Sequence, residues 1–138
     1  AVEIGVSSIT PIITTYTERK ILNYSRLNKI AISAMKQSLQ TYLPVINPIT
    51  NFKEFLKTNQ NSNNYIAHCN QSDKSHLSKS IEKKSDSNII IGPEGGFKDD
   101  EIKLAMDFNY TPISLGVNRL RTETAGIVSC QIFSDFNN

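Results

Sequence analysis

The chain has 138 residues, of which 38% are hydrophobic and 20% are charged, and its net charge is +2. This length and composition are typical of one soluble globular domain with a core of ordinary size. The mild positive charge permits a nucleic-acid partner but does not require one. No apolar run approaches the length of a transmembrane helix and no signal peptide is visible, so a membrane protein is excluded.

The cysteines and histidines give no sign of a metal site. Cys69 and Cys130 show neither CxxC nor metal-ligand spacing, so we expect a reducing compartment, a cytoplasmic location and no metal. His68 follows apolar residues and is either a general base or a hydrogen-bonded core residue. Neither a Walker loop nor a GxGxxG dinucleotide fingerprint is present.

The pattern of residues 1–23 predicts a strand followed by a loop. Ala1–Val6 is typical of a helix end with Gly5 as its C-cap, so we expect that something normally precedes it. Isoleucines predict a strand over Val6–Thr14 despite Pro11. The polar segment Thr15–Asn23 predicts a loop.

The clearest helix pattern begins at Ser25. Its apolar and small residues recur at steps of three and four, namely Leu27, Ile30, Ala31, Ala34, Met35 and Ser38. Leu43–Ile46 should end this helix and open a short extended piece. A short helix is expected over Asn51–Thr58, followed by a loop over Asn59–Asn64.

Two buried strands are predicted in the middle of the chain. The first covers Tyr65–Cys69. The polar segment Gln71–Ser87 follows, with a short helix over Leu77–Lys83. Ile89–Ile91 is an uninterrupted β-branched run, which suits a strand buried on both faces.

The last third predicts helix, strand and helix, over Asp99–Phe108, Tyr110–Leu115 and Thr122–Phe136. The residues of the first of these helices expected to face the core are Ile102, Ala105, Met106 and Phe108. Because strands alternate with helices, the class is α/β, with a mainly parallel sheet and flanking helices. Ligands bind such sheets beyond the carboxyl ends of strands, so the loops after Cys69, Ile91 and Leu115 should converge.

The stretch Asn88–Phe97 is the centre of this pattern, because a strand runs into the glycine-rich segment Gly92–Gly96 before a helix. Such glycines let a ligand approach the backbone, and free N–H groups at a helix start favour anionic groups. Glu94 is either a solvated or helix-capping carboxylate, or one that orients a ligand amine or hydroxyl.

Leu115–Ala125 shows a second strand that ends in a glycine, Gly116, before a helix. Thr122 is expected as the N-cap and Glu123 in the first turn. The helix dipole disfavours a cation at Arg121, so a paired or anion-directed role is expected for this residue.

Four segments in this order and spacing resemble the signature of the RsmE family, namely Ile91–Phe97, Glu101-Ile102, Leu115-Gly116 and Leu120–Ala125. Val2–Pro11 is similar to the start of the family's catalytic domain, and the match spans nearly the whole chain. These enzymes are methyltransferases of the SPOUT superfamily that methylate ring nitrogen 3 of a uridine in small-subunit (16S) ribosomal RNA.

The resemblance implies that residues 1–138 form a SPOUT catalytic domain with a C-terminal trefoil knot. It also implies S-adenosylmethionine as methyl donor, small-subunit ribosomal RNA as partner, and a homodimer whose sites are completed by the other chain. No part of these residues resembles the family's N-terminal PUA-like RNA-binding domain. The cofactor residues that it implies are His68, Ile91, Gly92, Pro93, Glu94, Gly95, Gly96, Leu115, Gly116, Leu120, Arg121, Thr122, Thr124 and Ala125.

The implied reaction requires the uracil ring nitrogen to lose its proton, because the protonated nitrogen is a poor nucleophile. Arg121 is the candidate cation that stabilises the uracil anion, or else a phosphate clamp. Glu94 or Glu123 would act as the base or hold Arg121 in place.

Three positions depart from the family pattern. Lys36 and Gln40 stand where the family usually has glutamate and arginine, and Lys98 stands where a serine usually caps a helix, so Asp99 is expected to take over. A non-catalytic relative that binds cofactor or ribosomal RNA without turnover therefore remains the alternative function.

Overall fold

The computed structural model describes residues 1–60, 63–70 and 72–138. Its elements in chain order are the 3₁₀ helix η1 (Val2–Ile4), β1 (Ser8–Ile9), β2 (Ile12–Ile13), α1 (Tyr24–Gln37), β3 (Val45–Ile46), β4 (Thr50–Asn51), α2 (Phe52–Thr58), β5 (Asn63–Ala67), β6 (Ser75–His76), α3 (Leu77–Ser80), β7 (Ser87–Ile91), α4 (Asp99–Asp107), β8 (Thr111–Ser114) and α5 (Thr122–Asn137). No helix among the described residues is long and apolar enough to cross a bilayer.

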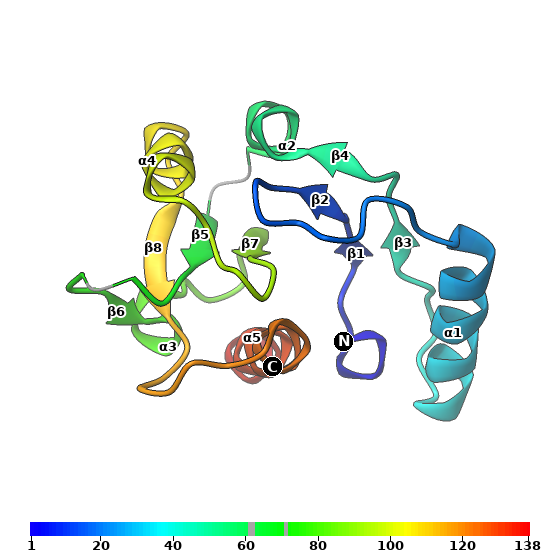
Figure 1. The fold of residues 1–138 in the computed structure, drawn as a ribbon. Helices are drawn as coiled ribbons and strands as arrows, with labels where there is room; N and C mark the ends of the chain where they lie inside the picture. The colour runs from blue at the N-terminus through cyan, green and yellow to red at the C-terminus, as the bar shows by residue number, and fades with distance from the viewer. Residues whose placement is uncertain (61–62, 71) are drawn as a thin grey trace.

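The main sheet has four strands in the order β6-β8-β5-β7, and every pair within it is parallel (Figure 1). Helices α2 and α4 pack on one face, where their side chains form a core with Ile66 and Ile90. Helices α3 and α5 cover the other face, where Tyr65 is buried and Ile89 packs against the same cluster. Successive residues of a strand point to opposite faces, so β5 and β7 each contribute to both cores. The predicted α/β class with a parallel sheet is confirmed, whereas the trefoil knot stays a prediction.

The strand predicted over Val6–Thr14 is two short strands with different partners. β1 pairs with β3 and β2 pairs with β4, both in parallel, so the chain changes partner at Thr10-Pro11. Proline has no N–H to donate to a sheet ladder, which explains the interruption. The Pro11 carbonyl still accepts from the backbone N of Thr50, at 3.0 Å.

Helix α1 begins one residue before the predicted Ser25, because the Asn23 side chain accepts a hydrogen bond from the Arg26 N at 3.0 Å and caps the helix. Its predicted apolar stripe is incompletely covered. Ala31 is buried, but Ile30 is 55% exposed. The helix lies at the far end of the molecule from the four-stranded sheet (Figure 1) and contacts η1 and β3.

Several boundaries and one core residue differ from the prediction. β5 begins at Asn63, inside the predicted loop Asn59–Asn64, and it ends before His68. Residues 61–62 of that loop and Gln71 of the predicted polar segment lie outside the described residues. Asn64 is accommodated in the strand because the Asn88 amide donates to its side-chain oxygen at 3.2 Å.

The remaining corrections concern helices. The short helix predicted over Leu77–Lys83 ends at Ser80, and the two-residue strand β6 before it was not predicted. Met106 was expected in the core but is 52% exposed. The buried stripe of α4 is centred on Ala105, with Leu104 and Phe108 packed beside it, so Met106 lies at the edge of the stripe.

We predict that Leu56→Ala lowers the free energy of unfolding by ~2–5 kcal/mol, because it leaves a cavity in the core beneath α2 and α4. Leu56 is 0% exposed. Urea unfolding measures the change. Ile21→Ala is the control, since Ile21 is 86% exposed, and it should change stability by less than about 0.5 kcal/mol. Equal losses in the two variants would contradict the assigned core.

Candidate active site

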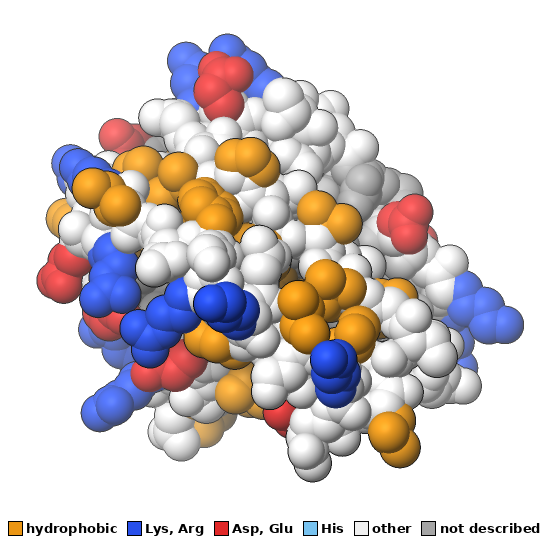
Figure 2. Space-filling model, turned by 90° about the vertical axis from the view of Figure 1, so that its right-hand side faces the viewer, with side chains coloured by type: hydrophobic (Ala, Val, Ile, Leu, Met, Phe, Trp, Pro, Cys, Tyr) orange, Lys and Arg blue, Asp and Glu red, His pale blue; other side chains and the backbone are white. Residues whose placement is uncertain are grey.

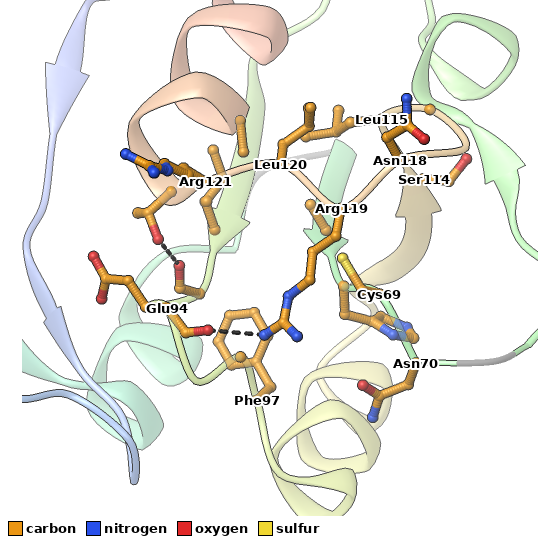
Figure 3. A pocket seen from close by; sticks show the side chains of 18 of the residues that line it. Cys69, Asn70, Glu94, Phe97, Ser114, Leu115, Asn118, Arg119, Leu120 and Arg121 are labelled. Carbon is orange, nitrogen blue, oxygen red and sulfur yellow. Dashed lines mark hydrogen bonds between the residues drawn. The ribbon is translucent and has the colours of Figure 1, made fainter.

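Three adjacent strands of the sheet, β8, β5 and β7, end level with one another. Ala67 at the end of β5 is paired in register with Ile91 of β7 and with Ile113 of β8. The loops that follow therefore leave the sheet at the same edge, and together they line a pocket of about 700 Å³ (Figure 3). Its lining comes from residues 67–70, 91–97 and 114–122, with Lys74 and Ala125 in addition. This is the convergence that the parallel topology predicted.

Most of the predicted site residues line this pocket, namely His68, Ile91, Gly92, Pro93, Glu94, Gly95, Gly96, Leu115, Gly116, Leu120, Arg121, Thr122 and Ala125. Glu123 and Thr124 do not line it; both are exposed in the first turn of α5. The pocket also includes residues that were not predicted. Most of these are chain neighbours of predicted ones, so extending each loop by a few residues would have found them. Lys74 lies farther along the connection between β5 and β6 that begins with His68, and it was not among the predicted site residues.

Thr122, at the start of α5, is bonded to the glycine loop that follows β7. Its hydroxyl donates to the Gly92 carbonyl at 2.7 Å. The prediction that Thr122 is the N-cap of α5 is wrong by one residue, because Arg121 occupies that position without a side-chain cap and Thr122 is the first helical residue. The hydroxyl is therefore free to bond across the pocket wall rather than to its own helix.

Arg119 makes a second bond to the same loop. Its Nη2 donates to the Glu94 carbonyl at 2.8 Å. Figure 3 shows the side chain reaching from the loop after β8 across to the glycine loop. Arg119 lies between the two late motifs, so the resemblance did not assign it a role. The segment 119–122 thus holds the glycine loop at two of its carbonyl groups.

The backbone of two loops is open where a side chain would otherwise stand. Gly96 and Gly116 have φ of +74° and +145°, a region that favours glycine, and a Cβ on either would meet no atom within 4 Å. Both residues line the pocket. A ligand can therefore approach the main chain closely at these points.

The charged side chains of the pocket are not neutralised by one another. Glu94 and Arg121 are both exposed. Among the described residues, neither Glu94 nor Glu123 forms an ion pair with Arg121. Two roles were expected for Arg121: pairing with a carboxylate, or binding an anion of the ligand. The geometry favours the anion-binding role, because no described carboxylate pairs with its guanidinium.

His68 lies just after β5 and not within the strand. Its Nδ1 is 3.4 Å from the Lys74 Nζ, while its Nε2 is buried and has no hydrogen-bond partner within the described part of the chain. Burial lowers the pKa of His68, and the nearby Lys74 ammonium lowers it further, against a smaller opposing effect of Asp99. Because an ammonium can only donate, we assign the proton of the neutral ring to Nε2. His68 therefore presents a donor that a ligand oxygen or nitrogen could satisfy.

The start of α4 is organised by Glu101, and not by Asp99 as predicted. Glu101 Oε2 accepts from the backbone N of Lys98 at 2.9 Å, which satisfies a donor at the helix start. Its Oε1 accepts from both the N and the Oγ1 of Thr15, each at 2.8 Å. Asp99 instead accepts from the Asn70 amide at 2.7 Å, which links α4 to the loop after β5.

The chain belongs to the RNA methyltransferase domain family, whose family model matches residues 1–134. The resemblance to RsmE proteins is confirmed at the level of individual relatives. "Ribosomal RNA small subunit methyltransferase E" of Rickettsia conorii is 37% identical over 135 residues, covering 94% of this chain and 54% of the relative. The protein of the same name from Buchnera aphidicola of Acyrthosiphon pisum is 35% identical, with 99% and 57% covered. The chain thus spans about half the length of these relatives.

Solved structures show the same fold. A probable rRNA-methyltransferase from Porphyromonas gingivalis matches with a TM-score of 0.92 at 37% identity, over 99% of this chain and 58% of the other. A Legionella pneumophila methyltransferase solved with bound SAM matches with a TM-score of 0.87 at 31% identity, over 97% and 57%. Ribosomal RNA small subunit methyltransferase E from Neisseria gonorrhoeae, bound to S-adenosyl methionine, matches with 0.84 at 30% identity, over 99% and 57%.

We predict that Thr122→Val lowers the free energy of unfolding by ~0.5–1.5 kcal/mol, because the Gly92 carbonyl loses its donor. Thr124→Val is the matched control, since Thr124 lies in the same helical turn but is exposed. Because both variants place a valine in α5, the lower helix propensity of valine cancels when their unfolding free energies are compared. Urea unfolding of both variants provides the comparison, and a Thr122 variant no less stable than the Thr124 variant would contradict the assigned bond.

His68 should make stability depend on pH. Its pKa in the folded chain lies below the ordinary value of 6.5, so the unfolded chain takes up the proton first as the pH falls. The unfolding free energy should therefore decrease from about pH 7 downward, until the folded pKa is passed. His68→Gln removes this contribution, so it should lose less stability than the wild type between about pH 7 and pH 5.5 in urea unfolding. Identical losses in the two proteins would contradict the lowered pKa.

Proposed function

We propose that this chain is the catalytic domain of an S-adenosylmethionine-dependent methyltransferase that acts on small-subunit ribosomal RNA. One observation carries the proposal: the loops after β7 and β8, which contain the family motifs, meet the loop after β5 around a single pocket at the carboxyl ends of these strands. The SAM bound in two solved relatives supports the same ligand class for this pocket.

The pocket fits this cofactor by the chemistry that it offers. The buried His68 Nε2 lacks a partner, and a ligand acceptor would satisfy it. Gly96 and Gly116 expose backbone groups that can hold an adenosyl moiety without side-chain interference. S-adenosylmethionine, when bound, supplies a methyl group carried on a sulfonium. Leu115, Leu120 and Ala125 would contribute apolar contacts to it.

At a finer level, we propose ring nitrogen 3 of a uridine in 16S RNA as the methyl acceptor. Arg121 would stabilise the uracil anion; each unit by which it lowers the pKa of that nitrogen is worth ~1.4 kcal/mol. A charge-assisted hydrogen bond from the guanidinium would contribute about 1.5–3 kcal/mol. Glu94 lines the pocket and is the better placed of the two candidate bases, because Glu123 lies outside the lining.

We also propose a cytoplasmic homodimer in which the partner chain helps to form each site. The support is a set of exposed apolar side chains on α1 and on the segment that follows it, namely Ile30, Ile32, Leu39, Tyr42, Leu43 and Val45. Figure 2 views the molecule from this side and shows several groups of hydrophobic side chains on the surface. Large exposed apolar surfaces of this kind often mark interaction sites.

The alternative function is a relative that binds cofactor or RNA without turnover, and Lys36 and Gln40 favour it. The Gln40 amide donates to the Glu3 carbonyl at 3.2 Å, and Lys36 is exposed. Neither residue lines the pocket. Their departure from the family pattern therefore bears on RNA or dimer contacts more than on cofactor binding within one chain.

We predict that the chain binds S-adenosylmethionine in a calorimetric titration, and that Arg121→Ala reduces methyl transfer to small-subunit RNA at least about a hundredfold, as expected when a group aimed at developing charge is removed. Arg121 is exposed and makes no ion pair with Glu94 or Glu123, so the melting temperature should change little. Tritium transfer from labelled cofactor measures the activity.

Arg19→Ala is the matched control, because Arg19 is an exposed arginine outside the pocket. Absence of cofactor binding by the wild type would refute the enzyme proposal. Binding without transfer would favour the non-catalytic alternative, and full activity of the Arg121 variant would refute the role given to that residue.

A further inference from the structure

Tyr16 is a large aromatic residue that stands beside the glycine loop and has no part in the pocket lining. It is 46% exposed. Its side chain lies so close to Gly95 that a Cβ on that glycine would come within 2.9 Å of the Tyr16 Cβ. Since Gly95 lines the pocket, Tyr16 is at the rim of the site. A glycine at position 95 is what allows this approach.

The backbone on both sides of Tyr16 is held in place. The N and Oγ1 of Thr15 both donate to Glu101 Oε1 at 2.8 Å. The Thr14 N donates to the Thr17 Oγ1 at 2.9 Å. The ring is therefore carried on a fixed turn tied to the start of α4. An exposed aromatic that is already ordered can bind a planar partner without a large loss of conformational entropy.

Among the described residues, one cation lies close to the Tyr16 ring. The Lys98 Nζ lies 5.9 Å from the centroid of the Tyr16 ring, within the range of a cation–π contact. Three acidic residues follow Lys98 in the chain, Asp99 to Glu101. Two of them are engaged in hydrogen bonds to Asn70, Lys98 and Thr15. The local surface is therefore not strongly basic, so a partner here would be held mainly by contact with the ring.

We propose that Tyr16 is a stacking platform for an unpaired base of the RNA substrate, adjacent to the nucleotide that enters the pocket, with Lys98 directed at a neighbouring phosphate. An exposed aromatic face with one nearby cation matches one nucleotide of single-stranded RNA, which offers a planar base and one negative charge. Bases of a duplex are stacked on each other and do not reach such a surface. The inference rests on the proposed RNA methyltransferase function and names how that site recognises its substrate.

The test measures fluorescence anisotropy of a labelled uridine-rich single-stranded RNA of about ten nucleotides, with saturating S-adenosylmethionine. Tyr16→Ala should weaken binding about tenfold, while Tyr16→Phe, which keeps the ring, should stay within about twofold of the wild type. Ile21→Ala is the control, because Ile21 is a large apolar residue that is 86% exposed and does not line the pocket; it should bind as the wild type does. A duplex of the same length should not distinguish Tyr16→Ala from the wild type.

The salt dependence of RNA binding distinguishes the role of Lys98 from that of Tyr16. Lys98→Gln should reduce the slope of log affinity against log salt by about 0.7, the loss of one phosphate contact to a single strand. Tyr16→Ala should leave that slope unchanged, because stacking releases no counterions. Cofactor titration and thermal melting of each variant show whether the site is intact.

If Tyr16→Ala binds RNA as tightly as the wild type, the stacking role of Tyr16 is overturned while the proposed function stands. Equal losses in Tyr16→Phe and Tyr16→Ala would overturn it too, because the ring would not be the recognised feature. If the wild type binds cofactor but no single-stranded RNA, only the stacking role of Tyr16 is overturned. If the wild type does not bind cofactor, the proposed function fails instead.

Discussion

The level ends of β5, β7 and β8 are the constraint on which the candidate site depends. Ala67 is in register with both Ile91 and Ile113, so three loops leave the sheet at one edge. Helices on both faces hold this register, since a slip by one residue would exchange Tyr65 for Ile66 and Ile89 for Ile90 between two separate cores. The pocket therefore follows from the packing of residues that do not line it.

The glycine loop has a glycine at three of its five positions, 92–96, so it has few side chains to hold it and its shape depends on its neighbours. Thr122 bonds the Gly92 carbonyl and Arg119 bonds the Glu94 carbonyl. Phe97 is buried in the core below the loop and fixes its other end. A loop held in this way can offer its remaining N–H and C=O groups to a ligand in a preformed arrangement, which reduces the entropy lost on binding.

The sequence predicted those parts of the molecule that depend on local pattern. The run Ile89–Ile91, the glycines that follow it and the order of the late motifs identified the main strand, the class and the family. The sequence did not predict contacts between residues that are far apart along the chain. Thr122 looked like a cap because its position suits one, and only its distance to Gly92 shows the other bond.

Arg119 and Lys74 carried no periodic or motif signal. Arg119 is bonded to a residue 25 positions earlier, in another loop, and Lys74 approaches His68, six positions earlier in its own loop. The apolar stripe of α1 was read correctly as a stripe. Its burial was overestimated, because periodicity shows that a face is apolar but not that this chain covers it. Ile30 remains exposed for that reason.

Four charged residues around the glycine loop differ in how many of their hydrogen bonds are already made within the protein. Glu101 accepts three hydrogen bonds, and the Arg119 guanidinium is bonded to a carbonyl. The charged groups of Arg121 and Glu94 are both exposed and are not paired with each other. A group that is already satisfied loses a bond when it turns to a substrate, whereas an unpaired guanidinium gains one without such a loss. This difference is the physical reason to assign the substrate-facing role to Arg121 and a positioning role to Arg119, although both are arginines of the same short segment.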